Sequence, residues 1–214
     1  MRRRTALATL AATAAMTALT ACGRKPVRGR PVAAGATVLA LGDSLTHGTG
    51  APPEAAYPAV LARLSGWAVV NAGVPGDTAA QALERLPALL EQHRPALVLL
   101  CIGGNDLLRR GDETALRETL RRLCGAITAS GAQCLLLAVP RPTIASRFTG
   151  SLSDHPLYAE LAEALQLPLH ARGWSEVLAD ERLRSDEIHA NAEGYAKFAQ
   201  GLMGTLRTAG LLPA

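Results

Sequence analysis

The chain has 214 residues, of which 49% are hydrophobic and 3% aromatic, and its formal net charge is +4. Seven of the 22 basic residues precede Pro31, whereas all 18 acidic residues follow it, so the remainder carries a formal charge of −3. The basic balance belongs to the amino-terminal segment and excludes a nucleic-acid-binding face on the rest of the chain. The length is typical of one domain, and the scarcity of aromatic residues predicts a core of Leu, Val and Ala.

The amino terminus has the pattern of an export signal. Met1 is followed by three arginines, and residues 5–21 form an uncharged run rich in Ala, Leu and Thr. This run is shorter than the ~20 strongly apolar residues that span a membrane. It ends in Leu19-Thr20-Ala21-Cys22. The alternatives for this ending are a plain secretory signal in which Cys22 occurs by chance and, less specifically, twin-arginine export.

The ending at Cys22 resembles a bacterial lipobox, in which the cysteine is lipidated and becomes the first mature residue. We therefore expect three parts: a signal peptide over 1–21, a lipidated Cys22 with a flexible basic tether over 22–35, and one domain over 36–214. The cations of the tether suit anionic lipid headgroups. This predicts a lipid-anchored protein of the bacterial cell envelope. The residue directly after Cys22 is Gly23, whereas an Asp at this position commonly marks retention in the inner membrane. In a Gram-negative host this favours the outer membrane.

From residue 36 onward, apolar runs alternate with amphipathic segments. The predicted strands are residues 37–42, 67–71, 96–102, 133–139 and a short one near 167–169. The predicted helices are residues 54–64, 78–92, 112–130, 156–165 and 191–208. This alternation predicts a three-layer α/β/α fold with a parallel sheet of about five strands. We expect Pro87 to kink the second helix and the polar loop from Arg141 to His155 to act as a lid or specificity loop.

Short polar motifs follow the first three strands, and a fourth precedes the last helix. They are Gly42-Asp43-Ser44, Gly76-Asp77-Thr78, Gly103-Gly104-Asn105-Asp106 and Asp186-Glu187-Ile188-His189. In this order they resemble the SGNH (GDSL) hydrolases, and among them the thioesterase, lysophospholipase and arylesterase branch. The resemblance runs from about residue 37 to about residue 201 and is closest over residues 38–105. It implies the flavodoxin-like sheet of these hydrolases, with strand order 2-1-3-4-5.

A serine hydroxyl becomes a nucleophile only when a base takes its proton. Ser44, at the end of the first strand, is the expected nucleophile, His189 the base, and Asp186 the carboxylate that orients His189. The plainer alternative for the last two is a surface carboxylate beside a solvated histidine. His47 is close to Ser44 in sequence, but we expect it at the rim of the pocket. We expect surface or loop positions for the other histidines: His93, His155 and His170.

Ester hydrolysis places negative charge on the carbonyl oxygen, and donors aimed at that oxygen stabilise it. The expected donors are the backbone N–H groups of Ser44 and Gly76 and the side-chain amide of Asn105. Gly73 competes with Gly76 for this role, and the resemblance favours Gly76. We expect structural roles for the neighbouring carboxylates, namely Asp43, Asp77 and Asp106.

No metal-ligand pattern is present, so we expect no metal or cofactor. The chain also lacks the Gly-x-Ser-x-Gly elbow of the α/β-hydrolases. Ala190 stands where the family commonly has a proline, which is expected to loosen the loop that carries His189. Cys124 and Cys134 either remain free or pair in an oxidising envelope, and Cys101 is expected to be a buried free thiol.

Together these features predict a serine esterase that acts on acyl esters or thioesters, as a monomer and without nucleic acid. The first alternative is a carbohydrate O-deacetylase. The second is a non-catalytic envelope lipoprotein that binds acylated ligands.

Overall fold

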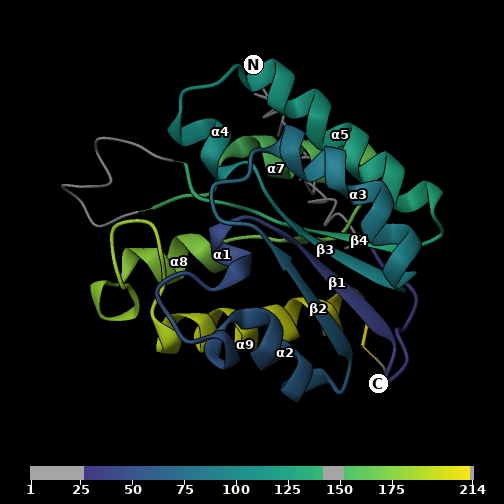
Figure 1. The fold of residues 1–214 in the computed structure, drawn as a ribbon, viewed down its shortest axis with the longest axis horizontal. Coiled ribbons are helices and arrows are strands. Elements are labelled where there is room, and N and C mark those ends of the chain that lie inside the picture. Colours follow the sequence, from purple (N-terminus) through teal and green to yellow (C-terminus); the bar gives the residue numbers. More distant parts are fainter. Residues whose placement is uncertain (1–26, 142–151, 213–214) are drawn as a thin grey trace, which may run out of the picture.

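The computed structural model describes residues 27–141 and 152–212. Within them five parallel strands form one sheet in the order β2-β1-β3-β4-β5 (Figure 1). The strands are β1 (Thr37–Gly42), β2 (Ala68–Gly73), β3 (Leu97–Cys101), β4 (Gln133–Leu137) and β5 (Leu169–His170). The predicted fold class and strand order are therefore confirmed.

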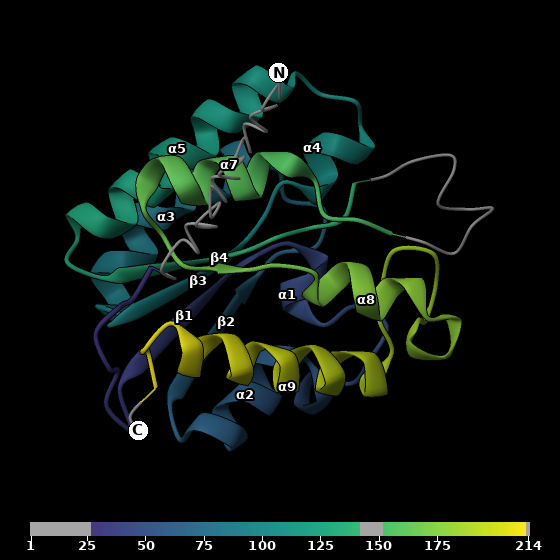
Figure 2. The ribbon, with the colours of Figure 1, turned by 180° about the vertical axis from the view of Figure 1, so that it is seen from behind.

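Helices cover both faces of the sheet (Figures 1 and 2). One face carries α3 (Ala79–His93), α4 (Gly104–Leu108), α5 (Glu113–Ala129) and α7 (Pro156–Leu165). The other carries α1 (Ser44–His47), α2 (Tyr57–Ser65), α8 (Gly173–Ala179) and α9 (Ala192–Thr208). Two 3-10 turns, η1 (Pro53–Ala55) and η2 (Glu181–Leu183), precede α2 and α9.

Capping side chains fix where the long helices begin. Thr78 and Gln81 form a reciprocal capping box at the start of α3, directly after the Gly76-Asp77 motif. Asp112 and Asn191 are the N-caps of α5 and α9, and their side chains accept hydrogen bonds from N–H groups of the first turn. The five predicted helices are present at nearly the predicted positions, and α3 continues through Pro87.

The aromatic side chains differ from the sequence expectation, because they form part of the core. Trp174 stacks on Phe198 with ring centroids 3.7 Å apart, and Tyr57 packs edge-on against both rings. Tyr195 contacts Trp174 in the same way. These four rings are at most 1% exposed and lie between the sheet and the helices α2, α8 and α9. A few large rings thus fill the layer that the sequence composition assigned to aliphatic side chains.

The first described residues are docked on the domain rather than free. Gly29 and Val32 donate their backbone N–H groups to the carbonyls of Ala209 and Leu211, just after α9, at 2.7 and 2.8 Å. The Gln133 side chain pairs with both backbone groups of Arg30, and Val32 is 2% exposed. This stretch therefore differs from the flexible tether expected through residue 35.

Two expectations lie outside the described residues. One concerns the signal peptide with Cys22, and the other concerns most of the loop between Arg141 and His155. Across the described ranges, no helix is long and apolar enough to cross a membrane.

Candidate active site

Ser44 is the first residue of α1, two positions after β1 ends at Gly42. The Asp43 carboxylate caps this helix by accepting the Leu45 N–H at 3.0 Å. The cap leaves the Ser44 N–H without an acceptor among the described residues, as is usual for the first turn of a helix. Burial raises the pKa of Asp43 to about 6, although the Leu45 N–H and the charge of His189 act in the opposite direction. Asp43 thus has the structural role expected for it.

Two tyrosines hold the loop that carries Ser44. The hydroxyl of Tyr57 lies 3.2 Å from Thr46 Oγ1, and the hydroxyl of Tyr195 donates to the Thr49 carbonyl at 2.8 Å. Both rings belong to the aromatic layer under the sheet. The packing of that layer therefore holds α1 through Thr46 and the loop after α1 through Thr49, a link that the sequence analysis did not anticipate.

Ser44, His189 and Asp186 form a continuous hydrogen-bonded chain. His189 Nε2 lies 2.9 Å from Ser44 Oγ, and His189 Nδ1 lies 2.7 Å from Asp186 Oδ2. The other oxygen of Asp186 accepts the backbone N–H groups of Ile188 and His189 at 2.9 and 2.8 Å. The structure thus brings together the three residues that the sequence analysis selected.

The hydrogen bonds around Asp186 decide the proton positions in this chain. Partial burial raises the pKa of the Asp186 carboxyl, but the bonds from the His189 ring and from the two backbone N–H groups outweigh it, and the net pKa is lowered. An ionised carboxylate only accepts hydrogen bonds, so the ring proton of neutral His189 lies on Nδ1. Nε2 is then the acceptor that faces the Ser44 hydroxyl.

Backbone contacts close the loop that carries His189. Ser185 donates its N–H to the His189 carbonyl at 3.0 Å, and Asn191 donates to the Leu183 carbonyl at 2.9 Å. The Asn191 side chain also donates to the Arg182 carbonyl at 2.7 Å, while Ala190 is fully buried. None of these contacts requires a proline at position 190.

Gly76 lies in a tight turn after β2. Asp77 donates its N–H to the Val74 carbonyl at 3.1 Å, and Gly76 has a φ of +85°. A proline in the second position and a left-handed glycine in the third are the composition of a type II turn. The N–H of Gly76 has no acceptor within the described ranges, so it is available to a ligand.

Asn105 lies in the first turn of α4, after β3. Its Nδ2 donates one hydrogen to the Asp77 carbonyl at 3.0 Å, and the second hydrogen of the amide remains for another acceptor. β2, β1 and β3 are neighbours in the sheet, so Gly76, Ser44 and Asn105 all follow the carboxyl ends of adjacent strands. Parallel α/β sheets bind their ligands at this edge.

The structure distinguishes the roles of Gly76 and Gly73. A Cβ on Gly73 would lie 2.1 Å from the backbone nitrogen of His47, so Gly73 is needed for the close approach of β2 and α1. A Cβ on Gly76 would meet nothing closer than 3.8 Å. Gly73 therefore has a packing role, and Gly76 has the open position expected for a donor.

The expectation for one of the other histidines is wrong, because His170 lies in strand β5 against Phe198 and is 5% exposed. His155 lies in a loop, as expected, but it is also 5% exposed because its side chain caps the buried start of α7. His47 is exposed, as expected.

The carboxylates of Asp77 and Asp106 connect the site to α3. Asp106 accepts the Ala79 N–H at 3.0 Å, and Asp77 accepts the Nε of Arg85 at 2.8 Å. Both have the structural role expected for them. The sequence analysis did not select Arg85 as a site residue. The feature that could have indicated it is a basic side chain between two positions of α3 that are buried, Ala82 and Leu86.

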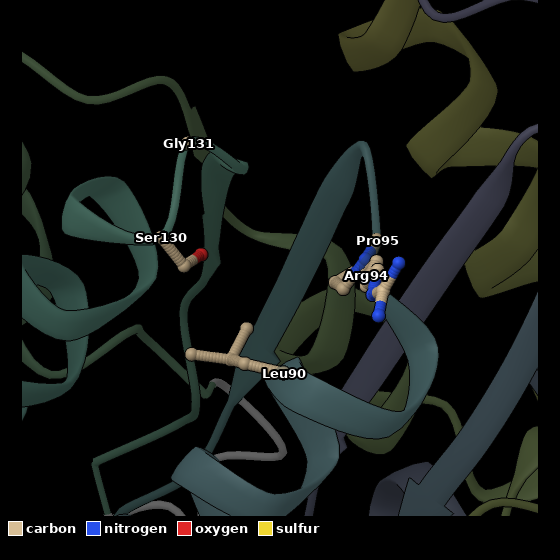
Figure 3. Close-up of a pocket in the computed structure, with 5 residues that line it drawn as sticks. All are labelled: Leu90, Arg94, Pro95, Ser130 and Gly131. Atoms are coloured by element: carbon tan, nitrogen blue, oxygen red, sulfur yellow. The ribbon is translucent and has the colours of Figure 1, made fainter.

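Other polar features lie apart from this site. A hollow of about 290 Å³ is lined by Leu90, Arg94, Pro95, Ser130 and Gly131, before the amino ends of β3 and β4 and thus at the opposite edge of the sheet (Figure 3).

Across residues 27–141 and 152–212, no group of three or more His, Cys, Asp or Glu side chains is placed to hold a metal ion. Cys101, Cys124 and Cys134 are buried free thiols, so the alternative of a disulfide is not realised.

Comparisons with known proteins show the family of this chain. Residues 40–197 match the GDSL-like lipase/acylhydrolase family. A thioesterase 1/protease 1/lysophospholipase L1 from Escherichia coli K12 is 39% identical over 179 residues, which cover 82% of this chain and 85% of the relative. An arylesterase from Vibrio mimicus is 32% identical over 170 residues, which cover 76% and 84%.

Solved structures give the same result. The psychrotrophic esterase EstA from a Pseudoalteromonas species, in a form inhibited by monoethylphosphonate, is similar with a TM-score of 0.70 and 25% identity. The match covers 80% of this chain and 96% of that esterase.

Proposed function

The chain belongs to the GDSL-like lipase/acylhydrolase family and is a serine esterase, and we propose that Ser44, His189 and Asp186 carry its reaction. The observation that supports this most directly is the hydrogen-bonded chain from Ser44 Oγ through His189 to Asp186. His189 takes the hydroxyl proton at Nε2 as Ser44 Oγ bonds to the acyl carbonyl carbon. Asp186 holds the ring orientation and stabilises the imidazolium that forms.

The tetrahedral intermediate carries its negative charge on the former carbonyl oxygen. In our proposal the N–H groups of Ser44 and Gly76 and the free hydrogen of Asn105 Nδ2 donate to this oxygen. His189 then protonates the leaving oxygen or sulfur, and the acyl chain remains on Ser44. A water molecule, deprotonated by His189, attacks the acyl-enzyme and releases the carboxylic acid.

Exposed apolar side chains beside the site support acyl groups as the substrate. Val74, Leu108 and Ile188 are each more than 40% exposed, and each lies within three residues of Gly76, Asn105 or His189. Because large apolar side chains at a surface favour apolar ligands, we infer that they contact the acyl chain. This agrees with the named thioesterase, lysophospholipase and arylesterase relatives.

A fluorophosphonate probe tests the nucleophile. We expect it to label wild-type protein at Ser44 and to leave Ser44→Ala unlabelled, while Ser130→Ala, at the opposite edge of the sheet, labels normally. Labelling that persists in Ser44→Ala would contradict the assignment. p-Nitrophenyl esters of graded chain length, an acyl-CoA and an acetylated sugar then separate long-chain ester, thioester and O-deacetylase activity.

We also propose that Cys22, which lies outside the described residues, anchors the protein to a membrane of the bacterial envelope. The support is the Leu19-Ala21-Cys22 pattern after an uncharged run. Mass spectrometry of protein purified from cells tests it: we expect a lipid-modified Cys22 at the amino terminus, and Cys22→Ala should be released from membranes. An intact Met1 on the mature protein would contradict the anchor.

A further inference from the structure

The guanidinium of Arg85 connects the ends of two strands that the proposed reaction uses. It extends from α3, and each of its nitrogens donates a hydrogen bond: Nε to Asp77 Oδ2 at 2.8 Å, Nη1 to the Ala72 carbonyl at 2.8 Å and Nη2 to the Gly42 carbonyl at 2.9 Å. We propose that Arg85 is a positioning residue that fixes the oxyanion donors relative to Ser44. The inference rests on the proposed function and deepens it.

The three acceptors lie at defined points near the reaction centre. Gly42 is the last residue of β1, two positions before Ser44. Ala72 is the next-to-last residue of β2, and this strand leads into the turn that contains Gly76. A planar guanidinium presents its donors in a fixed fork, so the three bonds together restrict the separation of the two strand ends.

Asp77 transmits this restraint to both other oxyanion donors. Its carboxylate accepts from Arg85, its carbonyl accepts Asn105 Nδ2 at 3.0 Å, and its N–H closes the turn on Val74 at 3.1 Å. Gly76 precedes Asp77 directly, and the Asn105 amide is oriented by its bond to Asp77. A shift of Asp77 therefore moves two of the three donors at once.

The side chains of Arg85 and Asp77 are both largely shielded from water. The Arg85 side chain is 24% exposed and the Asp77 side chain 9%. A charge-assisted hydrogen bond that is shielded from water holds its geometry better than an exposed ion pair. Arg109 offers a comparison, since it donates to the Gly76 carbonyl at 3.0 Å from an exposed position and has a hydrogen bond to this one acceptor among the described residues.

The test compares Arg85→Ala and Arg85→Lys with Arg63→Ala, which removes an exposed arginine bound to the Glu54 carbonyl. The full chain hydrolyses a p-nitrophenyl ester, and kcat is expressed per active site titrated with a fluorophosphonate. We expect kcat of Arg85→Ala to fall roughly 10- to 100-fold with KM nearly unchanged, because misplaced donors act on the transition state. Lysine makes fewer of the three bonds and should restore kcat in part, and Arg63→Ala should keep the wild-type rate.

A second arm distinguishes positioning from general stabilisation. In the Asn105→Ala background, Arg85→Ala should lower kcat at most about threefold. One of the oxyanion donors that Arg85 positions is already absent in that background. Equal losses in both backgrounds, or a kcat within about threefold of wild type, would overturn the inference. If Arg85→Ala does not fold, Arg85→Lys and Asp77→Asn give the same comparison. A wild-type protein without esterase activity would instead overturn the proposed function, and this inference with it.

Discussion

Within the Ser44–His189–Asp186 chain, the two residues that support the nucleophile differ in their exposure. The His189 side chain is 14% exposed and that of Asp186 53%. Because solvent replaces part of what a half-exposed carboxylate provides, the imidazole is the less dispensable of the two. We expect His189→Ala to remove nearly all turnover. The loss of rate in Asp186→Ala should be roughly 50- to 100-fold smaller than the loss in His189→Ala. Initial rates on a p-nitrophenyl ester measure both, and His47→Ala is the control that should remain active.

Asn105 differs from the backbone donors because its side chain can be removed. We expect Asn105→Ala to lower kcat roughly 10²- to 10³-fold with little change in KM, since the donor acts most strongly when charge develops on the oxygen. Steady-state kinetics separate the two parameters. An enzyme that keeps its kcat and binds substrate weakly would show that Asn105 contacts the ground state instead.

His170 makes the fold sensitive to acid. Burial lowers its pKa to about 4, although the charges of Asp154 and Glu176 act in the opposite direction. Its Nδ1 lies 2.7 Å from Thr205 Oγ1, while Nε2 has no partner among the described residues. The unfolded chain takes up this proton near pH 6.5 and the folded protein only near pH 4. The stability that a neutral His170 provides is therefore complete above pH 6.5 and is lost as the pH falls toward 4.

This loss amounts to at most roughly 3 kcal/mol, or a fall in Tm of roughly 6–12 °C in a domain of this size. Thermal melts of wild type and His170→Gln at pH 7 and pH 4.5 measure it. We expect the difference between the two pH values to be smaller in His170→Gln, and His93→Gln to match wild type. An equal pH dependence in all three proteins would exclude His170 as the cause.

At the scale of elements, the turn after β2 is the part of the site that depends most on backbone conformation. Gly76 has a φ of +85° and Gly66, at the end of α2, a φ of +72°, and a Cβ meets nothing within 3.5 Å at either. Alanine at both positions should therefore cost a similar stability of roughly 1 kcal/mol. Only Gly76→Ala should also lower kcat, by shifting the donor N–H. Equal activities in the two variants would show that the Gly76 N–H does not contribute.

The long elements and the order of the strands were predictable because each has a clear period or a buried apolar run. The strand β1 and the helix α7 have the predicted bounds. The short helices α1, α4 and α8 were not predicted, since four to seven residues show no period. The site residues were predictable because each follows a strand end or precedes a helix. Arg85 was not, because nothing in a sequence shows which carbonyls a single arginine reaches across 43 residues.

Residue burial was the least predictable property. His170 has the composition of a loop around it, yet β5 pairs with β4 and places its ring against Phe198. The aromatic layer arises in the same way, since Tyr57, Trp174 and Phe198 are far apart in sequence and meet only when α2, α8 and α9 pack on one face.

At the scale of the whole molecule, the start of the domain and the site lie at opposite edges of the sheet. Gly29 and Val32 are bound to residues just after α9, and Arg30 is bound to Gln133 at the amino end of β4, whereas Ser44 follows the carboxyl end of β1. Four residues separate Cys22 from Val27, so the chain between the two spans at most ~18 Å. The six residues of β1 alone extend roughly 20 Å. A lipid on Cys22 would therefore hold the amino edge near the membrane and direct the site away from it.

This geometry predicts that the anchored protein prefers substrates in solution to esters embedded in its own bilayer. Lipidated protein on vesicles should hydrolyse a soluble p-nitrophenyl ester as fast as Cys22→Ala protein in solution. A variant with about 20 Gly and Ser residues inserted between Pro26 and Val27 has a tether with a typical reach of roughly 27 Å. We expect it to cleave an ester embedded in the same vesicles faster than the natural protein, with an unchanged rate on the soluble ester. If the natural tether already gives the rate of the extended one, the site faces the membrane, and the docking of residues 29–32 does not persist in the anchored protein.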